Sequence, residues 1–448
     1  TLPEKNVILR LAQIYADMLH DIRHNNNTWY FNLLKAWSEI SKKSGCEYHI
    51  WEYMYCLWCE LTVPVAFRLS DAFKAFAEYG ITGIFVENES NFADMWELNQ
   101  YILSQLSENP YADIDALIDD FIKCFYGKAA KYVKEYLYDL KRSAEEHPVS
   151  AYCTTESVHF SYLDDLAVSR GISLLDKAFE AAKGDETLTY RINQLMTMLK
   201  ESAVIKYYDL KRMAELNSRT FDFDIKALRD DVVAGIDKMK GHPKFKNADK
   251  HFEDFKDYFK NLCLTEDIAP LPDELKDVNP DDVYQFFFKN SCRQLIFKNY
   301  YGVTFVDDKD ASLGRAEKIT ISDANPLETI ALHATSKNVK YPTGVLVKIR
   351  HNDEYTGGVE LCLEDIVPDK YHTYKIGSVS GIKTSTDTRL DIFGNNLEWL
   401  GLVGISQVMP MDACDVYLTI KFTGKAYGGK ETEPDAVYLD RAIVVRKG

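Results

Sequence analysis

The chain has 448 residues, of which 46% are hydrophobic and 27% are charged, and its formal net charge is −16. This length predicts two or three domains, and the composition excludes a disordered chain. The negative charge would repel phosphate-rich partners, which excludes nucleic acid as a main partner, and no apolar run is long enough to span a bilayer.

Helical and buried-strand patterns alternate near the start of the chain. Helical periodicity predicts helices over residues 7–20 and 28–43, and Gly45 is suited to end the second one. The aromatic run 48–55 and the apolar run 81–86 then predict two buried strands.

A third helix is predicted between these two strands, capped by Ser70 or Asp71 and running to Gly80. A strand, a helix and a second strand in this order form a βαβ unit, and its two strands are parallel.

From residue 93 to about residue 264 the periodicity is almost entirely helical. Short loops between such helices predict a bundle-like domain. The expected helices are 93–107, 112–126, 128–146, 158–182, 186–216, 223–240 and 247–263.

An acidic, proline-containing linker is predicted at 265–281, and beyond it the period changes to two. Short strands with polar turns predict a β-sandwich of jelly-roll type over 282–448. The expected strands are 283–288, 293–300, 344–351, 357–364, 371–378, 388–394, 414–422 and 436–446.

Two glutamates are candidates for catalysis. Glu52 lies within the aromatic strand and Glu87 directly follows the next strand. A carboxyl group in an apolar setting tends to keep its proton and can act as a general acid. Glycosidases use two carboxylates, or one together with an acetamido group of the substrate. The alternative is a helix cap or a pair with an arginine. Nearby rings that could stack on sugars are Trp51, Tyr53, Tyr55 and Trp58.

The residues give no support for a metal or an organic cofactor. His20 and His24 are four residues apart, but the glutamate of a zinc-protease motif is absent between them. We expect instead that His24 or Asn27 hydrogen-bonds a sugar at a cleft. Cys56 and Cys59 form a CxxC pair without a second pair, which favours plain core cysteines.

Residues 1–145 resemble a gut-bacterial domain first described as of unknown function. That domain is related to glycoside hydrolase families 20 and 67 and is present in family 163 endo-β-N-acetylglucosaminidases. The resemblance rests on NNNTWYFNLLKAW (25–37), YHIWEYMY (48–55), the turn at Pro64, YGITGIFVENES (79–90) and DIDALIDDFIKCFYGKAAKYVKEYLYDL (113–140).

Together with the patterns above, the resemblance predicts a multidomain α/β, α and β protein. Residues 1–92 would be the last strands and helices of a catalytic (β/α)8 TIM barrel whose earlier strands precede Thr1, and residues 93–264 the helical domain. It also implies a secreted or cell-surface bacterial protein. The residues it assigns to the lining of a sugar site are Trp51, Glu52, Tyr53 and Glu87.

Two functions follow as hypotheses. The first is a glycoside hydrolase that acts on a β-linked, N-acetylhexosamine-containing glycan with Glu52 and Glu87 at a shared rim. The second is a non-catalytic glycan-binding or structural protein in which the β-sandwich carries the affinity. Candidate sugar platforms of that sandwich are Tyr371, Tyr374 and Trp399.

Overall fold

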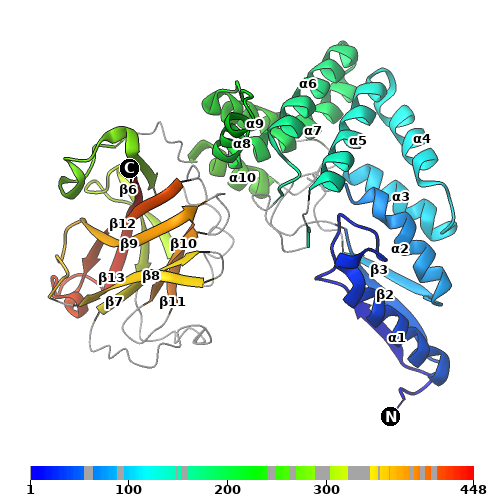
Figure 1. Cartoon of the computed structure of the whole chain (residues 1–448), viewed down its shortest axis with the longest axis horizontal. Helices are drawn as coiled ribbons and strands as arrows, with labels where there is room; N and C mark the ends of the chain where they lie inside the picture. Colours follow the sequence, from blue (N-terminus) through cyan, green and yellow to red (C-terminus); the bar gives the residue numbers. More distant parts are fainter. Residues whose placement is uncertain are drawn as a thin grey trace. The chain divides into compact units, whose positions relative to one another are not determined.

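The computed structural model of the chain divides into two compact units, Thr1–Lys256 and Asp257–Gly448 (Figure 1). The structure describes residues 2–54, 64–87, 95–147, 150–152, 160–240, 242, 249–261, 269–287, 303–320, 344–351, 354–362, 364–382, 388–393, 399–404 and 411–447. The predicted strand 293–300, the Cys56–Cys59 pair and the candidates Tyr55 and Trp58 lie outside these residues. The finer division into four parts stays a prediction.

The first unit begins with a three-stranded parallel sheet in the order β1-β2-β3. The strands are β1 (Ile8–Ala12), β2 (Glu47–Tyr53) and β3 (Gly83–Glu87). The two predicted strands are confirmed, but the helix predicted over 7–20 is wrong. Its apolar residues suit a helical period equally well, and pairing with β2 makes the segment a strand with Leu11 buried.

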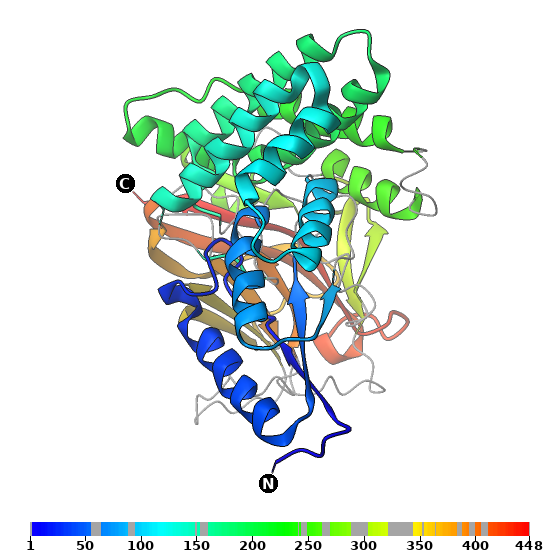
Figure 2. The same cartoon turned by 90° about the vertical axis from the view of Figure 1, so that its right-hand side faces the viewer.

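Helices α1 (Thr28–Ser44) and α2 (Ala66–Glu78) cover one face of this sheet, as Figure 2 shows for α1. Tyr48 of β2 is fully buried and its hydroxyl donates to Leu34 O of α1 at 3.3 Å. Gly45 ends α1 with φ at 70°, as predicted. Helix α2 begins at Ala66, without the side-chain cap expected at Ser70 or Asp71.

The opposite face of the sheet is open among the described residues. Ile8 is 51% exposed and Phe85 is 46% exposed, and both point away from the helices. Parallel sheets are normally covered on both faces. Three strands in an open sheet do not form a closed barrel, so the TIM barrel stays a prediction.

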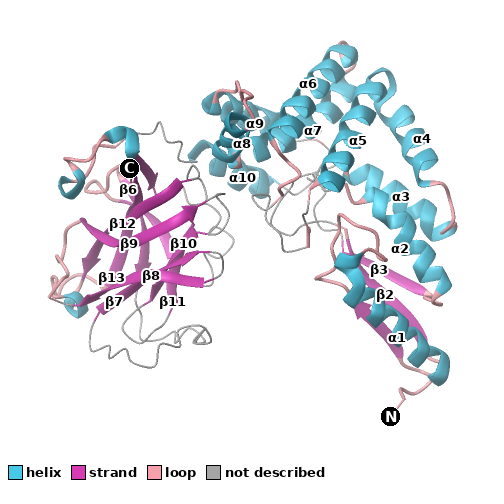
Figure 3. Ribbon diagram, in the orientation of Figure 1, coloured by secondary structure: helices cyan, strands magenta, loops and turns pink. Residues whose placement is uncertain are grey.

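Most of the helices that follow agree with the predicted segments (Figure 3), but the helix predicted to start at residue 158 begins only at Asp165. The predicted helix 186–216 is two helices that meet at Lys206, a buried residue whose Nζ donates to Phe160 O and Leu163 O. The helices are α3 (Trp96–Glu108), α4 (Ile114–Tyr126), α5 (Ala130–Glu146), α6 (Asp165–Ala182), α7 (Glu186–Ile205), α8 (Tyr207–Leu216), α9 (Ile225–Met239) and α10 (Asp249–Asn261), with short 3-10 turns at Asn25–Asn27 and Gly127–Ala129.

The second unit contains two antiparallel sheets, one ordered β11-β10-β7-β8 and one ordered β5-β6-β13-β12-β9, with β4 paired to β13. Three of these strands, β5, β6 and β11, were not predicted. The strands are β4 (Val283–Phe287), β5 (Val303–Asp307), β6 (Arg315–Thr320), β7 (Gly344–His351), β8 (Glu354–Cys362), β9 (His372–Ile382), β10 (Thr388–Phe393), β11 (Trp399–Gly404), β12 (Met411–Thr423) and β13 (Ala436–Arg446).

Side chains from both sheets share one core. Ile349 of β7 and Leu361 of β8 pack in the same cluster as Val379 of β9 and Phe422 of β12. The described part of the linker contains 3-10 turns at Asp273–Leu275 and Pro280–Asp282, and a further one lies at Lys425–Tyr427. The jelly-roll connectivity of a β-sandwich stays a prediction.

Candidate functional site

The carboxyl ends of the three parallel strands meet at one edge of the sheet, which we call the rim. Strand β1 ends there at Ala12, β2 at Tyr53 and β3 at Glu87. In open parallel sheets, ligands bind at this edge, because the loops that follow the strands converge on it. The loop of residues 13–27, which follows β1, is described in full.

Aromatic rings line the open face of the sheet next to the rim. The rings of Trp51 and Tyr53 stack, with centroids 6.1 Å apart and planes 13° apart. Phe85 meets Trp51 edge to face at 5.0 Å. The strand register places Tyr53 beside Glu87 on the same face. Tyr53 is only 8% exposed, so Phe85 and the half-buried Trp51 supply the accessible ring surface beside the Glu87 carboxylate.

The Glu87 carboxylate is held by the indole of Trp51. Trp51 Nε1 donates a hydrogen bond to Glu87 Oε2 at 2.8 Å. Among the described residues, this is the hydrogen bond that the structure gives to the Glu87 carboxylate. At the other end of β3, Gly83 leaves room for the His49 ring, because a Cβ there would lie 2.7 Å from it.

Glu52 lies in a different environment, between the sheet and the helices. Its side chain is fully buried, and Arg68 Nη2 of α2 donates to Oε1 at 2.5 Å. Arg68 also donates to Tyr53 O at 2.9 Å. Burial raises the pKa of Glu52, and the charge and hydrogen bond of Arg68 only partly offset this effect.

The prediction that Glu52 and Glu87 point into one hollow is therefore wrong. Successive side chains of a strand point to opposite faces. Glu87 pairs in register with Tyr53, and Glu52 with Val86, so the two carboxylates lie on opposite faces of the sheet. The alternative reading, an acid paired with an arginine, describes the geometry of Glu52.

Buried polar atoms surround Glu52. Its Oε2, the Nε2 of Gln13 and the hydroxyl of Tyr30 have no partner at hydrogen-bond distance in the described part of the chain. Glu52 and Arg68 both influence the pKa of Tyr30, which burial raises, and Gln13 lies close enough to lower the pKa of Glu52. Gln13, Tyr30 and Arg68 were not predicted. Their only sequence signal is an apolar context that ordinary core residues share.

The predicted sugar contacts in the 13–27 loop have different surroundings. Asn27 is 1% exposed, and its amide group bonds to the backbone of Asp17, His20 and Asp21. It is thus committed to the loop itself and closed to a ligand in this structure. The ring of His24 stacks on that of His20, with centroids 4.2 Å apart.

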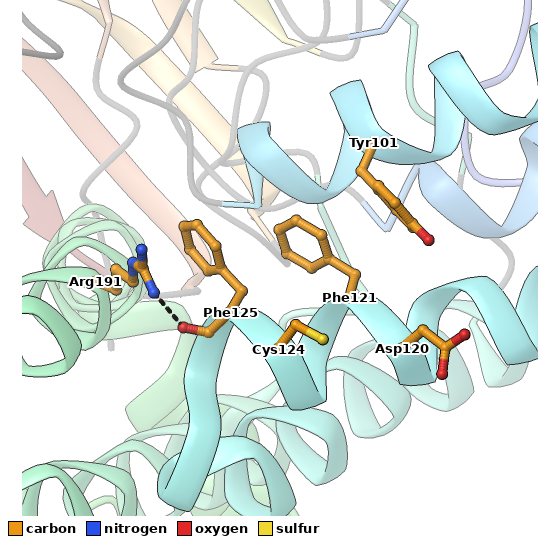
Figure 4. A pocket seen from close by; sticks show the side chains of 6 residues that line it. All are labelled: Tyr101, Asp120, Phe121, Cys124, Phe125 and Arg191. Carbon is orange, nitrogen blue, oxygen red and sulfur yellow. Dashed lines mark hydrogen bonds between the residues drawn. The ribbon is translucent and has the colours of Figure 1, made fainter.

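A separate hollow of about 310 Å³ lies on helices α3, α4 and α7 (Figure 4). Phe121 and Phe125 of α4 stack at 4.9 Å, and Tyr101 of α3 lies 5.4 Å from Phe121. The guanidinium group of Arg191 lies 3.7 Å from the Phe125 ring centroid. Asp120 and the exposed Cys124 complete the lining. This aromatic row was not predicted.

In the second unit, two of the aromatic residues predicted to bind sugars are bonded to other side chains or buried. Tyr371 donates to Asp308 Oδ2 at 2.9 Å, and Lys421 Nζ lies 4.8 Å from its ring centroid. Tyr374 is 8% exposed. The side chain of Trp399 is outside what the structure describes.

The described residues contain no group of three or more His, Cys, Asp or Glu side chains that could hold a metal ion. None of the helices described in the structure is both long and apolar enough to cross a membrane.

Comparison with known proteins gives a match for the first unit. Residues 1–138 match the family model described as "Domain of unknown function (DUF4838)". The resemblance to a domain of formerly unknown function is confirmed for these residues, whereas the relation to families 20, 67 and 163 stays a prediction. No curated protein matches the chain.

Among solved structures, the chain is similar to a "GH138 enzyme targeting pectin rhamnogalacturonan II". The TM-score is 0.30 and the sequence identity is 11%, and the match covers 99% of this chain. The chain spans 60% of the length of that structure. At this TM-score the similarity does not establish a shared fold.

Proposed function

We propose that this chain is part of a glycoside hydrolase that acts on a β-linked, N-acetylhexosamine-containing glycan, and that the glycan binds at the rim of the first sheet. The observation that carries this proposal is the hydrogen bond from Trp51 to Glu87 on an open aromatic face. Rings of this kind stack on the apolar faces of sugars, and a carboxylate beside them can exchange a proton with a glycosidic oxygen.

Glu87 is the catalytic carboxylate in this proposal. The indole of Trp51 fixes Oε2, so that Oε1 faces the substrate in a defined orientation. Trp51 would stack on the sugar ring with the buried Tyr53 packed against it, and His24 of the neighbouring loop would bind a hydroxyl group. The second group that the reaction needs is the acetamido oxygen of the substrate itself, or a carboxylate outside the described residues.

Glu52 acts in support of this site. Through Arg68, which also binds Tyr53 O, it fixes the end of β2 and with it the rings of the open face. It thereby contributes to activity through position and not through contact with the glycan.

The test compares three variants of the full chain on tri-N-acetylchitotriose. Glu87→Gln should lower the rate of sugar release at least about a hundredfold without a change in melting temperature. Trp51→Phe keeps the ring but removes the N–H donor, and should cause a smaller loss. Glu47→Gln, at the exposed start of β2, is the matched control and should leave the rate unchanged. Full activity of the Glu87→Gln variant would contradict the assignment of Glu87 as the catalytic carboxylate.

A non-catalytic glycan-binding protein is the alternative. The observation that favours it is the aromatic row of the hollow on α3, α4 and α7, because stacked rings can bind sugars without any carboxylate chemistry. This alternative differs from the one predicted from the sequence, in which the β-sandwich binds the glycan. Chitotriose binding that is lost in Phe121→Ala but retained in Glu87→Gln, without hydrolysis by the natural chain, would support this alternative.

A further inference from the structure

The loop of residues 13–27 contains two histidines, His20 and His24, whose rings stack on each other. The loop follows β1, and its path is fixed by Asn27, which accepts from Asp17 N at 2.8 Å and donates to three carbonyl groups of the loop. The loop follows β1 and Glu87 ends β3, so both belong to the edge of the sheet at which these parallel strands end.

A buried carboxylate orients the first histidine. Asp17 is fully buried, and its Oδ1 accepts from the backbone N–H groups of Leu19 and Ala151, each at 3.0 Å. Its Oδ2 accepts from His20 Nδ1 at 2.6 Å and from Asn26 Nδ2 at 2.9 Å. Burial acts to raise the pKa of Asp17, but these hydrogen bonds together lower it below its usual value. The carboxylate is therefore charged, and it fixes the ring of His20.

The two stacked rings have opposite tautomers, as the hydrogen-bond network assigns them. His20 donates from Nδ1 to Asp17, so in the neutral ring Nε2 carries a lone pair. His24 Nδ1 accepts from Asn26 N at 3.3 Å, so its proton lies on Nε2. The ring planes differ by 16°. The pair thus offers one acceptor nitrogen and one donor nitrogen on two rings whose centroids lie 4.2 Å apart.

We propose that His20 and His24 form a binding site for a single sugar hydroxyl group, in which His20 Nε2 accepts the hydroxyl proton, His24 Nε2 donates to the hydroxyl oxygen, and Asp17 is the positioning residue. A hydroxyl group is both donor and acceptor, so it matches this pair, whereas a carboxylate or an ammonium group matches only one member of it. The inference rests on the proposed function for the identity of the ligand as a glycan.

The site should respond to pH through His20. The hydrogen bond to Asp17 raises the pKa of His20, burial opposes it, and the charges of Asp17, Asp21 and of Glu145 on α5 add to the increase. His24 is the other titratable group in contact with the ring. Below this pKa, Nε2 of His20 becomes a donor and cannot accept the hydroxyl proton. Affinity should therefore rise as the pH rises through the pKa of His20.

The experiment measures the binding of tri-N-acetylchitotriose to the full chain by calorimetry at mildly acidic, neutral and mildly alkaline pH. His20→Phe keeps the stacked ring but removes both nitrogens, and should weaken binding at alkaline pH about tenfold. His24→Phe should have a similar effect. His242→Phe is the matched control, an exposed histidine that stacks on Tyr190, and should not change the affinity.

Asp17→Asn tests the positioning role separately. It should lower the pKa of His20, observed by NMR of the imidazole nitrogens, and flatten the pH dependence of binding. Equal affinity of the natural chain, His20→Phe and His24→Phe at every pH overturns the inference, even if Glu87→Gln abolishes hydrolysis. Weaker binding by the two phenylalanine variants supports it, even if no variant and not even the natural chain hydrolyses the glycan. An absence of binding by the natural chain overturns the ligand class.

Discussion

At the scale of single residues, the pair of Glu52 and Arg68 links the core to the rim. Both side chains are almost fully buried, and the pKa of Glu52 is raised by burial in spite of the arginine. Taking two charges out of water costs about as much as their attraction returns. The pair is therefore best understood as a fixed link between α2 and the end of β2 and not as a large source of stability.

Removing only the arginine should be far more harmful than removing both charges. Arg68→Ala leaves a buried carboxylate without its partner, and should lower the free energy of unfolding at neutral pH by about 3–5 kcal/mol. The matched double variant Glu52→Leu with Arg68→Met should lose much less. Urea unfolding of the full chain measures both changes.

The loss in Arg68→Ala should also depend on pH, with a defined sign. An acid whose pKa is raised in the folded chain binds its proton more readily there than in the unfolded chain. Stability is therefore lost as the pH rises above the unfolded pKa towards the folded pKa, and it returns as the pH falls. Repeating the unfolding at mildly acidic pH should show a smaller difference from the natural chain. An equal difference at both pH values would contradict this account.

At the scale of elements, most of the helices were predicted from their periodicity, and capping aspartates mark where four of them begin. Asp113, Asp164, Asp185 and Asp224 each accept from backbone N–H groups in the first turn of the helix that follows. Strand β1 was missed, since five residues without such signals become a strand only by pairing with β2. The predicted helix 186–216 is divided at Lys206, whose buried side chain hydrogen-bonds to backbone carbonyl groups far away in the sequence. No local sequence pattern indicates such bonds.

The cap of α9 offers a direct test of this explanation. Asp224 accepts from Ala227 N at 2.7 Å, so Asp224→Ala should destabilise the first unit by about 1 kcal/mol, while Asp224→Asn should cost only a small part of that. Asp230→Ala is the control on the same helix, because that side chain is 69% exposed and pairs only with the adjacent Arg229 among the described residues. Thermal unfolding followed by circular dichroism measures the three variants, and equal effects of Asp224→Ala and Asp230→Ala would refute the role of the cap.

The candidate site was predictable only in part. The sequence correctly pointed to Trp51, Tyr53 and Glu87 as neighbours at the end of parallel strands, because their places in the two strands already suggest it. It could not show which face each glutamate occupies, since this depends on the register of β2 against β3. Asp17 and His20 became a candidate pair only once β1 and its loop were seen.

At the scale of the whole molecule, the chain consists of two compact units with separate cores. The rim, the histidine pair and the hollow all lie in Thr1–Lys256, so the proposed chemistry depends on the first unit. The second unit is built around its own shared core of two antiparallel sheets. Substitutions that damage one core should therefore leave the other one intact.

Calorimetry of the full chain can test this independence. Leu34 of α1 and Phe422 of β12 are both fully buried, and replacing either one with alanine should cost about 2–5 kcal/mol. We expect two thermal transitions, of which Leu34→Ala lowers only one and Phe422→Ala only the other. Chitotriose, if it binds at the rim, should raise only the transition that Leu34→Ala lowers, because a ligand stabilises the unit that binds it. A single transition that both variants lower equally would show instead that the two cores unfold together.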